Sequence, residues 1–485
     1  MKNSISFLNI IERHNQNHDA IKYQKIVYTY ADLTKRAKYW EKLLEPITVI
    51  GSIVICQYED NPFEYTAKFL AIMNVGGVHY SSRDIKNTIT RLEAIGLTYA
   101  VLGDIKPSGL ESQFCLYSID QDGKLLSQLK PTSLNLYLPT AGRILETSGS
   151  TGLPKLVYWH EQDLVQDRIT WCNQLSLTDS DIILNLHPLD FAHGIDVHIL
   201  SGIISGCSVI HLPLHDNNYS NISQIIKSTK ITMMSALPSH YVGIANASES
   251  SSVGRTVRWA LTGGALLSGS SVKQIQQLSG INLKRLYGAT EAGVMCADLS
   301  DTTQLEPHLH PMTGVEIRLE SLVGISNQYP NIGEACFKRA HLASGYVGDI
   351  EKTAKIFSID GWYRSGDAVR QNPDNSFEVL GRIEDIWIDN ETNALFYSGS
   401  IIDTIIAFDE VLEVVAIAPA QTKSKHAVIF CRVSTFTTIQ SVKDLVQNYI
   451  DHIQLIATIY ILNDWPSTIV GKPDRRSLLT WAATT

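Results

Sequence analysis

The sequence predicts an α/β protein. It has a large N-terminal region of mixed, largely parallel β-sheets packed with helices, a small β subdomain, and a small α+β unit at the C-terminal end. Short β-branched runs alternate with helical stretches through most of the chain, which is typical of parallel sheets. Residues 314–339 hold shorter strands and more turns, and beyond Arg382 the alternation restarts. The length of 485 residues corresponds to roughly three compact units at about 150 residues each.

The elements of the N-terminal region follow one another in a regular order. Residues 47–57 hold a β-branched run typical of a buried strand, and residues 61–75 have helical spacing and end at Gly76-Gly77. A further helix is predicted over residues 271–278. Five more strands are predicted as short apolar runs that end in Gly, Pro or a turn: YAVLGD (99–104), CSVIHLPL (207–214), ITMMSALP (231–238), VRWALTGG (257–264) and NLKRLYG (282–288).

The C-terminal unit repeats strand and helix signals over about a hundred residues. Its predicted elements are VLEVVAIA (411–418), AVIFCRVS (427–434), a helix over 439–451 and ATIYIL (457–462). We therefore expect a separate α+β domain here.

Composition excludes several classes of protein. The 40 basic and 49 acidic side chains give a net charge of −9, which argues against a nucleic-acid binder. Residues 197–214 are too interrupted by His, Gly and Pro for a membrane span, and they predict a buried helix followed by a buried strand. Seven cysteines without CxxC or zinc-like spacing indicate reduced, buried thiols in a cytoplasmic protein, and no targeting segment is evident.

The strongest local motif is TSGSTGLPK, residues 147–155. Its glycines let the backbone approach a phosphate chain, its N–H groups can form an anion nest, and its hydroxyls and lysine add donors and positive charge. It is not a Walker A loop, and the alternative is a flexible Ser/Gly surface loop. The candidate ATP-binding residues are Thr147, Ser148, Gly149, Ser150, Thr151, Gly152 and Lys155.

This motif resembles the phosphate loop of the adenylate-forming superfamily, which comprises acyl-CoA synthetases, nonribosomal peptide synthetase adenylation domains and luciferases. YGATE (287–291) resembles the family's YGxTE motif, and YRSGD (363–367) resembles YxTGD. Gly381-Arg382 opens the hinge motif, and GKPDR (471–475) resembles GKxDR. The resemblance spans almost the whole chain. It implies an ATP- and acid-binding domain over residues 1–383 and a mobile C-terminal domain over 384–485, with the hinge at Glu384.

The implied chemistry joins a carboxylate to the α-phosphate of ATP. A carboxylate is ionised near pH 7, so positioning and charge neutralisation should dominate and no general base is needed. Lys472 would bridge the carboxylate and the α-phosphate during transfer. The resemblance assigns Mg²⁺ to Glu291, the α-phosphate to Thr290, the adenine side to Tyr287, Gly288, Gly263, Gly264 and Ala265, and the ribose to Asp367 and Arg382.

The segment after the hinge departs from the family. Between Arg382 and Lys423 there is no Lys or Arg, and a solvated acidic face is one interpretation. As a docking face it would suit neither the phosphates of coenzyme A nor an acidic carrier protein, which leaves the second half-reaction open. Basic residues farther along the chain could compensate: Lys423, Lys425, Lys443, Arg475 and Arg476. The acids between Arg382 and Lys423 are Glu384, Asp385, Asp389, Glu391, Asp403, Asp409, Glu410 and Glu413.

The resemblance implies a substrate pocket lined by residues around 187–197, 235–241, 262–265 and 293–296. It takes in most of the segment HPLDFAHGIDVH (187–198), together with Ser235. Asp190, His193 and Asp196 fall within seven residues. They could form a metal site, be ordinary polar turn residues, or anchor an amino or hydroxyl group of the substrate. Where α-amino-acid adenylation domains carry Phe-Asp, this chain carries Phe191-Ala192, which weakens a standard α-amino acid as the substrate.

These observations predict a stand-alone AMP-forming ligase that uses ATP and Mg²⁺. The expected substrate is a small aryl, amino (including β-amino) or hydroxylated acid. The chain ends soon after Lys472 without a fused carrier domain, so the acceptor should be external: coenzyme A, or phosphopantetheine on a separate carrier protein. Two alternatives are an amide- or ester-forming adenylating ligase and a non-catalytic adenylate-binding protein.

Overall fold

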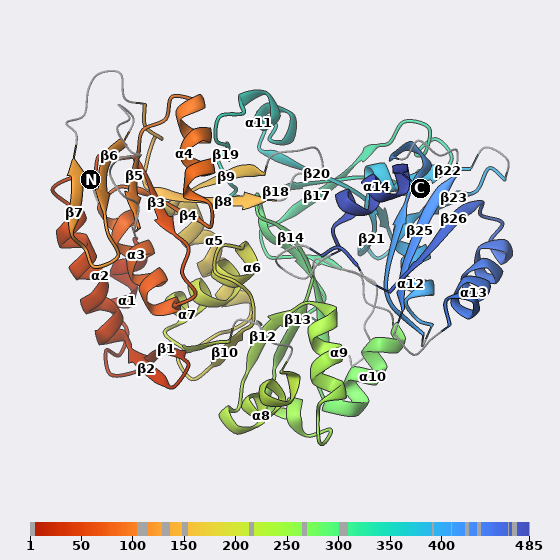
Figure 1. The fold of residues 1–485 in the computed structure, drawn as a ribbon, viewed down its shortest axis with the longest axis horizontal. Coiled ribbons are helices and arrows are strands. Elements are labelled where there is room, and N and C mark those ends of the chain that lie inside the picture. Colours follow the sequence, from red (N-terminus) through yellow and green to blue (C-terminus); the bar gives the residue numbers. More distant parts are fainter. Residues whose placement is uncertain are drawn as a thin grey trace.

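Two large mixed sheets form the N-terminal part of the protein, and smaller sheets follow them toward the C-terminus (Figure 1). The computed structural model describes residues 5–103, 115–128, 136–147, 154–212, 218–263, 269–299, 309–389, 392–408, 410–421, 426–433, 438–463, 465–467 and 473–484. The predicted α/β class is confirmed.

The first large sheet has eight strands among the described residues. Its central pairs are parallel, whereas β9, β19 and β7 add antiparallel edges. The hairpin of β8 and β9 sets Thr147 opposite Lys155, so residues 148–154 connect the two strands. In spatial order the strands are β19 (Gly345–Tyr346), β9 (Lys155–His160), β8 (Gly142–Thr147), β4 (Val78–Ser82), β3 (Ile53–Gln57), β5 (Tyr99–Leu102), β6 (Cys115–Ile119) and β7 (Leu125–Gln128).

The second large sheet has nine strands among the described residues, and its centre is parallel from β1 to β14. Parallel strands end at the same edge, which gathers the loops after them on one side of the sheet. In spatial order they are β16 (His310–Pro311), β15 (Gly293–Ala297), β14 (Leu283–Ala289), β13 (Trp259–Thr262), β12 (Met233–Ala236), β10 (Ile182–Asn185), β11 (Ser208–His211), β1 (Asp19–Tyr23) and β2 (Ile26–Thr29).

Local sequence signals explain where several helices begin. Thr29 and Asp32 form a capping box at the start of α2, and Asn61 caps α3, whose first residue is Pro62. The N-terminal helices are α1 (Phe7–Ile11), α2 (Tyr30–Leu44), α3 (Pro62–Asn74), α4 (Ile85–Ala94), α5 (Glu161–Gln174), α6 (Ala192–Gly194), α7 (Leu200–Ser205), α8 (Tyr219–Thr229), α9 (Pro238–Asn246), α10 (Gly269–Ser279) and α11 (Ile350–Ile356).

The predicted β subdomain is an antiparallel sheet of β17 (Glu316–Ser321), β18 (Ile332–Lys338), β20 (Trp362–Gln371) and β21 (Phe377–Arg382). The C-terminal unit, blue in Figure 1, lies beside it, since α12 and β22 contact β21. That unit contains β22 (Ile386–Ile388), β23 (Leu395–Tyr397), α12 (Ser398–Ile405), β24 (Val411–Ile417), β25 (Ala427–Val433), α13 (Ile439–His452), β26 (Ala457–Leu462) and α14 (Arg475–Thr484).

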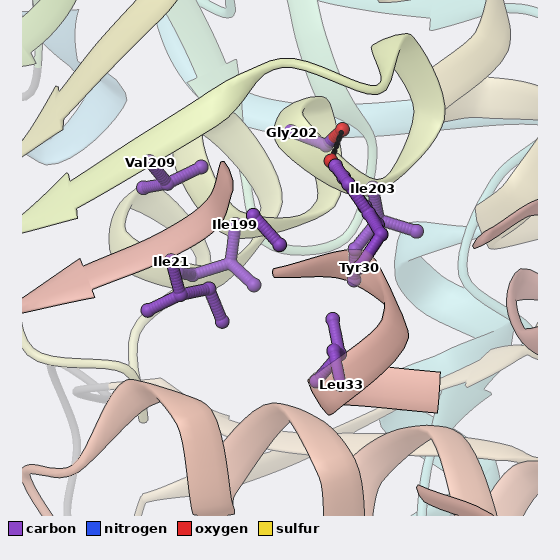
Figure 2. A pocket seen from close by; sticks show the side chains of 8 residues that line it. Ile21, Tyr30, Leu33, Ile199, Gly202, Ile203 and Val209 are labelled. Atoms are coloured by element: carbon purple, nitrogen blue, oxygen red, sulfur yellow. Dashed lines mark hydrogen bonds between the residues drawn. The ribbon is translucent and has the colours of Figure 1, made fainter. Parts of the chain in front are cut away.

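A π-helix over Ile195–Ile199 joins α6 to α7, in the stretch predicted as a buried helix followed by a strand. Such turns insert an extra residue and often occur at functional sites. A cavity of about 10 Å³ lies between α7, the start of α2 and the strands β1 and β11, and it is lined mostly by apolar side chains (Figure 2). The Tyr30 hydroxyl donates to the Gly202 carbonyl oxygen there at 2.8 Å. This cavity is at the lower limit for a single water and offers no ligand site.

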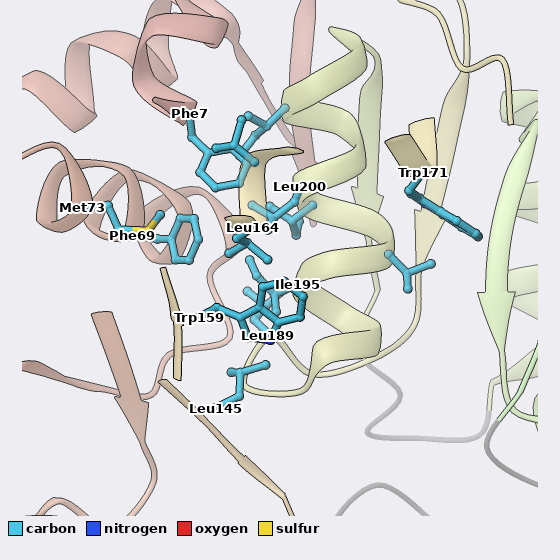
Figure 3. Packing of buried hydrophobic residues seen from close by; sticks show 14 of the residues in the cluster. Phe7, Phe69, Met73, Leu145, Trp159, Leu164, Trp171, Leu189, Ile195 and Leu200 are labelled. Carbon is cyan, nitrogen blue, oxygen red and sulfur yellow. The ribbon is translucent and has the colours of Figure 1, made fainter. Parts of the chain in front are cut away.

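The main core fills the space between the two large sheets. Trp159, Leu189 and Ile195 lie side by side next to the π-helix, while Phe7 and Phe69 meet farther along α7 (Figure 3). All seven cysteines are buried with free thiols, as predicted, and burial is the main cause that raises the pKa of each. Within the described residues, no helix is long and apolar enough to cross a membrane.

Candidate active site

Three separate motifs meet at Asp367. The residue faces Arg382 across the β20–β21 pair, and Arg382 Nε lies 3.3 Å from Asp367 Oδ1. Tyr287, near the end of β14, donates its hydroxyl to Asp367 Oδ2. Arg382 also donates to the carbonyl oxygen of Ser365 at 3.0 Å. Residues 287, 367 and 382 therefore form one polar cluster, although 95 residues of sequence separate the first from the last.

Burial controls the protonation of this cluster. It raises the pKa of Tyr287 well above the usual range, and the Asp367 charge adds to that effect, so the tyrosine stays a hydrogen-bond donor. Burial also raises the pKa of Asp367, whereas Arg382 and the Tyr287 hydroxyl oppose that rise. Each Asp367 oxygen already has one protein partner. A carboxylate has about four acceptor sites, so it can still receive two hydroxyl groups.

A second cluster surrounds Glu291. Its side chain is buried, and Oε1 accepts a hydrogen bond of 2.7 Å from the Tyr346 hydroxyl on β19. Lys155 Nζ lies 5.2 Å from the centre of the Tyr346 ring. Burial lowers the pKa of Lys155, and the Glu291 charge opposes this shift. The carboxylate of Glu291 and the ammonium group of Lys155, the first residue of β9, thus both lie next to the ring of Tyr346 on β19.

The phosphate-loop motif is described only at its two ends. Ser148, Gly149, Ser150, Thr151 and Gly152 lie outside the described residues. Thr147 Oγ1 is buried and has no hydrogen-bond partner among the described residues, so it can serve a ligand. Tyr80 donates its hydroxyl to the neighbouring Glu146.

Two of the predicted glycines lie where chains approach closely. A Cβ at Gly263 would lie 2.6 Å from Leu286 Cδ1, and one at Gly288 would lie 2.5 Å from the Gly293 carbonyl oxygen. Side chains are therefore excluded at both positions beside Tyr287. Gly264, Ala265 and Lys472 lie outside the described residues.

Both aspartates of the predicted substrate segment are paired with arginines. Asp190 accepts from Arg83 at 2.6 and 3.0 Å, and Asp196 forms a buried ion pair with Arg143 of β8. The structure does not bring Asp190 and Asp196 together with His193 as a ligand set. Within the described ranges no group of three His, Cys, Asp or Glu side chains could hold a metal ion.

His193 instead belongs to a histidine cluster. Its members lie in the segments predicted to line the pocket, although the sequence did not indicate that they meet. His193 Nε2 is hydrogen-bonded to Ser235 Oγ, and its ring stacks on His187 with centroids 4.4 Å apart. His198 and His240 lie within 6 Å of His187. The available signal was the position of His187 shortly after β10 and of His240 in the helix that follows β12, because the ends of parallel strands gather at one edge.

His198 is held as a neutral imidazole. Its Nδ1–H donates to the His193 carbonyl oxygen at 2.7 Å, and its Nε2 accepts from the Ser235 amide at 3.1 Å. Burial lowers the pKa of His198 to about 4 and that of His240 to about 4. Near neutral pH these two imidazoles are therefore uncharged.

The acidic stretch after the hinge is not one solvated face. Asp385 is buried and accepts from both terminal nitrogens of Arg475 at 2.6 Å. Glu413 pairs with Arg432 at 3.1 Å, and burial raises the pKa of Asp403 to about 6 against the opposing charge of Arg285. The sequence expectation failed here because basic partners come from distant elements. Glu391 and Asp409 lie outside the described residues.

Residues 144–347 match the AMP-binding enzyme family. The chain is 25% identical to Zwittermicin A synthase ZmaJ of Bacillus cereus, over 95% of this chain and 91% of that protein. It is 25% identical to 4-coumarate–CoA ligase 4 of Arabidopsis thaliana, over 68% of this chain and 60% of that protein. Another match is the hybrid PKS-NRPs synthetase opdA of Penicillium oxalicum, which is 26% identical over 73% of this chain. The match spans only 10% of the length of that synthetase.

Solved structures share the fold over nearly the whole chain. ATP-bound MatB from Rhodopseudomonas palustris superposes with a TM-score of 0.80 at 18% identity and covers 98% of both chains. The anthranilate CoA ligase AuaEII in complex with anthranoyl-AMP has a TM-score of 0.81 at 16% identity and covers 100% of this chain and 99% of its own.

Proposed function

Because residues 144–347 carry an AMP-binding domain with homologues among acyl-CoA ligases and nonribosomal peptide synthetase adenylation enzymes, we propose that this protein is an AMP-forming acid–thiol ligase. It converts a carboxylic acid and ATP into an acyl-adenylate and pyrophosphate. It then transfers the acyl group to a thiol with release of AMP. The observation that carries the proposal is the meeting of Tyr287, Asp367 and Arg382 beside the Glu291–Tyr346–Lys155 cluster.

Each cluster has one task in this reaction. Asp367 receives the ribose hydroxyls and is held in place by Tyr287 and Arg382, while Gly263 and Gly288 leave room for the adenine side. Thr147, Thr290 and Lys155, with residues 148–152, bind the phosphates. A buried carboxylate with nearby phosphate oxygens is a donor set that suits Mg²⁺, so Glu291 would hold the ion, which neutralises phosphate charge when bound.

Lys472 is proposed as the catalytic lysine that neutralises charge between the acid and the α-phosphate. Its assignment rests on the GKPDR motif. The domain boundary at residues 383 and 384, with Glu384 as the hinge, is part of the same proposal. The contact of Arg475 with Asp385, one residue past Glu384, supports it because the C-terminal helix thereby reaches the hinge.

The substrate is proposed to be a small aryl, amino or hydroxylated acid bound near the histidine cluster. Asp190 and Asp196 already have arginine partners, which weakens their role as anchors for a substrate ammonium group. The His193–Ser235 pair and the neutral imidazoles of His198 and His240 favour an acid with a hydroxyl or aryl group. The acceptor is proposed to be coenzyme A or a carrier-bound phosphopantetheine.

Acid-dependent ATP–pyrophosphate exchange tests the first half-reaction. A panel of aryl, hydroxylated, short-chain, fatty, α-amino and β-amino acids should give a strong response with one class. Lys472→Ala should lower exchange by orders of magnitude, whereas Lys443→Ala, an exposed lysine in the same unit, should not. ATP binding without exchange for any acid would favour the non-catalytic alternative. Product formation with amines or hydroxylamine but not thiols would favour the amide-forming one.

A further inference from the structure

Arg339 holds the turn that follows Glu291. It comes directly after β18, and its side chain is 7% exposed. Its Nη1 donates to the carbonyl oxygens of Ala292 at 2.7 Å and Val294 at 3.1 Å. One guanidinium group therefore fixes two peptide groups within three residues of the proposed Mg²⁺ ligand.

Arg339 is itself fixed by a buried carboxylate. Its Nη2 forms an ion pair with Asp167 of α5, whose side chain is 1% exposed and also pairs with Arg168. Gly293 has φ +65°, and a Cβ there would lie 2.9 Å from Asp167 Oδ2. The turn thus lies directly against the ion pair, with no room for a side chain between them.

The other contacts of this turn act on different groups. Trp159 Nε1 donates to the Thr290 carbonyl oxygen at 2.7 Å, and the Ala343 amide donates to that of Glu291 at 2.9 Å. The carbonyl oxygens of Thr290 and Glu291 therefore have hydrogen-bond donors of their own. Among the described residues, the side-chain donor to the two carbonyls after it is Arg339.

We infer that Arg339, backed by Asp167, is a positioning residue that holds the Glu291 carboxylate in place for the metal–nucleotide complex. The inference rests on the proposed function, which gives Glu291 the metal. A lysine cannot replace the planar fork, because one ammonium group cannot reach two carbonyls and a carboxylate in the same geometry. Partners behind a metal ligand commonly change metal affinity when they are replaced.

Calorimetric titration of the full chain with ATP tests this role, once with Mg²⁺ and once with EDTA. The ratio of the two affinities isolates the metal-dependent part of binding. Arg339→Lys should reduce that ratio by roughly tenfold while affinity in EDTA stays near that of the parent. Lys68→Met is the matched control, because Lys68 on α3 is a buried cation that pairs with Glu59. This variant should leave the ratio of the two affinities unchanged.

Combination with Glu291→Gln distinguishes the outcomes. If Arg339 acts through Glu291, the double variant should have the same ratio as Glu291→Gln alone. If the two substitutions lowered the ratio additively, or if Arg339→Lys left the ratio unchanged, the inference would be overturned while the proposed function would stand. An unchanged ratio in Glu291→Gln would overturn the proposed metal role and the inference with it. If Arg339→Lys does not fold, Asp167→Asn provides the same comparison with the guanidinium group retained.

Discussion

Arg91 of α4 donates to the carboxylate of Glu146 at 3.1 Å, and its other terminal nitrogen donates to the carbonyl oxygen of Pro154 at 2.5 Å. Glu146 precedes the segment of residues 148–153, and Pro154 follows it. One side chain from a helix thereby fixes both ends of the phosphate-loop motif relative to each other.

Replacement of Arg91 by Met should therefore weaken nucleotide use more than it weakens the fold. We expect the KM for ATP to rise about tenfold, because small displacements of binding groups are costly. Steady-state pyrophosphate release at varied ATP measures this. Arg36→Met removes a comparable partly buried pair, between Arg36 of α2 and Glu64 of α3, and should leave the KM for ATP unchanged. Equal KM values in both variants would contradict the role of Arg91.

Loss of the Arg475–Asp385 contact should destabilise the C-terminal unit. Asp385 is 4% exposed and Arg475 is 37% exposed, so the pair is half buried. Arg475→Met leaves a buried carboxylate without its cation, and we expect a loss of about 2 kcal/mol in the free energy of unfolding measured in urea. A further Asp385→Asn substitution should recover part of this loss. Arg476→Met, an exposed neighbour, is the control and should change little.

Glu161 should make the protein less stable in base. Burial raises the pKa of this carboxyl to about 7 from an ordinary value of 4.5, and the amide of Phe7 opposes the shift. The folded state therefore holds a proton that the unfolded state releases. This contribution is present below about pH 4.5 and is lost as the pH rises through about 7.

Replacement of Glu161 by Gln removes this titration while retaining an acceptor for Phe7. Urea unfolding should show the variant and the parent nearly equal at about pH 5. At about pH 8.5 the variant should be more stable by about 2 kcal/mol. Exposed Glu249 gives the control, since Glu249→Gln should show no such divergence. If the difference in the free energy of unfolding between the variant and the parent were the same at both pH values, Glu161 would not be a buried, protonated carboxyl.

Buried histidines should have the opposite effect in acid. Burial, together with the smaller effect of the Arg143 charge, lowers the pKa of His79 to about 3. The unfolded state binds a proton near the ordinary value of 6.5, so stability is lost as the pH falls below that value toward 3. Between about pH 7 and 4.5 we expect His79→Phe to lose about 2 kcal/mol less stability than the parent. Exposed His452 serves as the control in the variant His452→Gln.

The helices and strands that local pattern predicted are present in the structure. The helix expected over 271–278 is α10, and the one expected over 439–451 is α13. The strand expected over 47–57 starts only at Ile53, because Gly51 adopts φ +80° and the chain turns before it. The small β subdomain was located at residues 314–339, but its partners β20 and β21 were not, since antiparallel pairing over long separations leaves no local signal.

The site was predictable only where a motif carries it. The sequence indicated Tyr287, Asp367 and Arg382 separately, and the fold brings them together. It could not indicate that Arg143 takes Asp196, or that Arg475 takes Asp385 from 90 residues away, because ion pairing depends on tertiary packing. For the same reason the sequence did not indicate that the histidines meet, since they come from the loop after β10, from α6, from the π-helix and from α9.

The seven buried cysteines make this chain well suited to site-selective fluorescent labelling. A maleimide reacts with an accessible thiolate, and burial denies both access and ionisation to every native thiol. A pair of new cysteines at the exposed positions Val323 in the β subdomain and Lys443 on α13 would therefore take up a donor and an acceptor dye without removal of the native seven. Energy transfer between them would report directly, in single molecules, whether the C-terminal unit turns during catalysis.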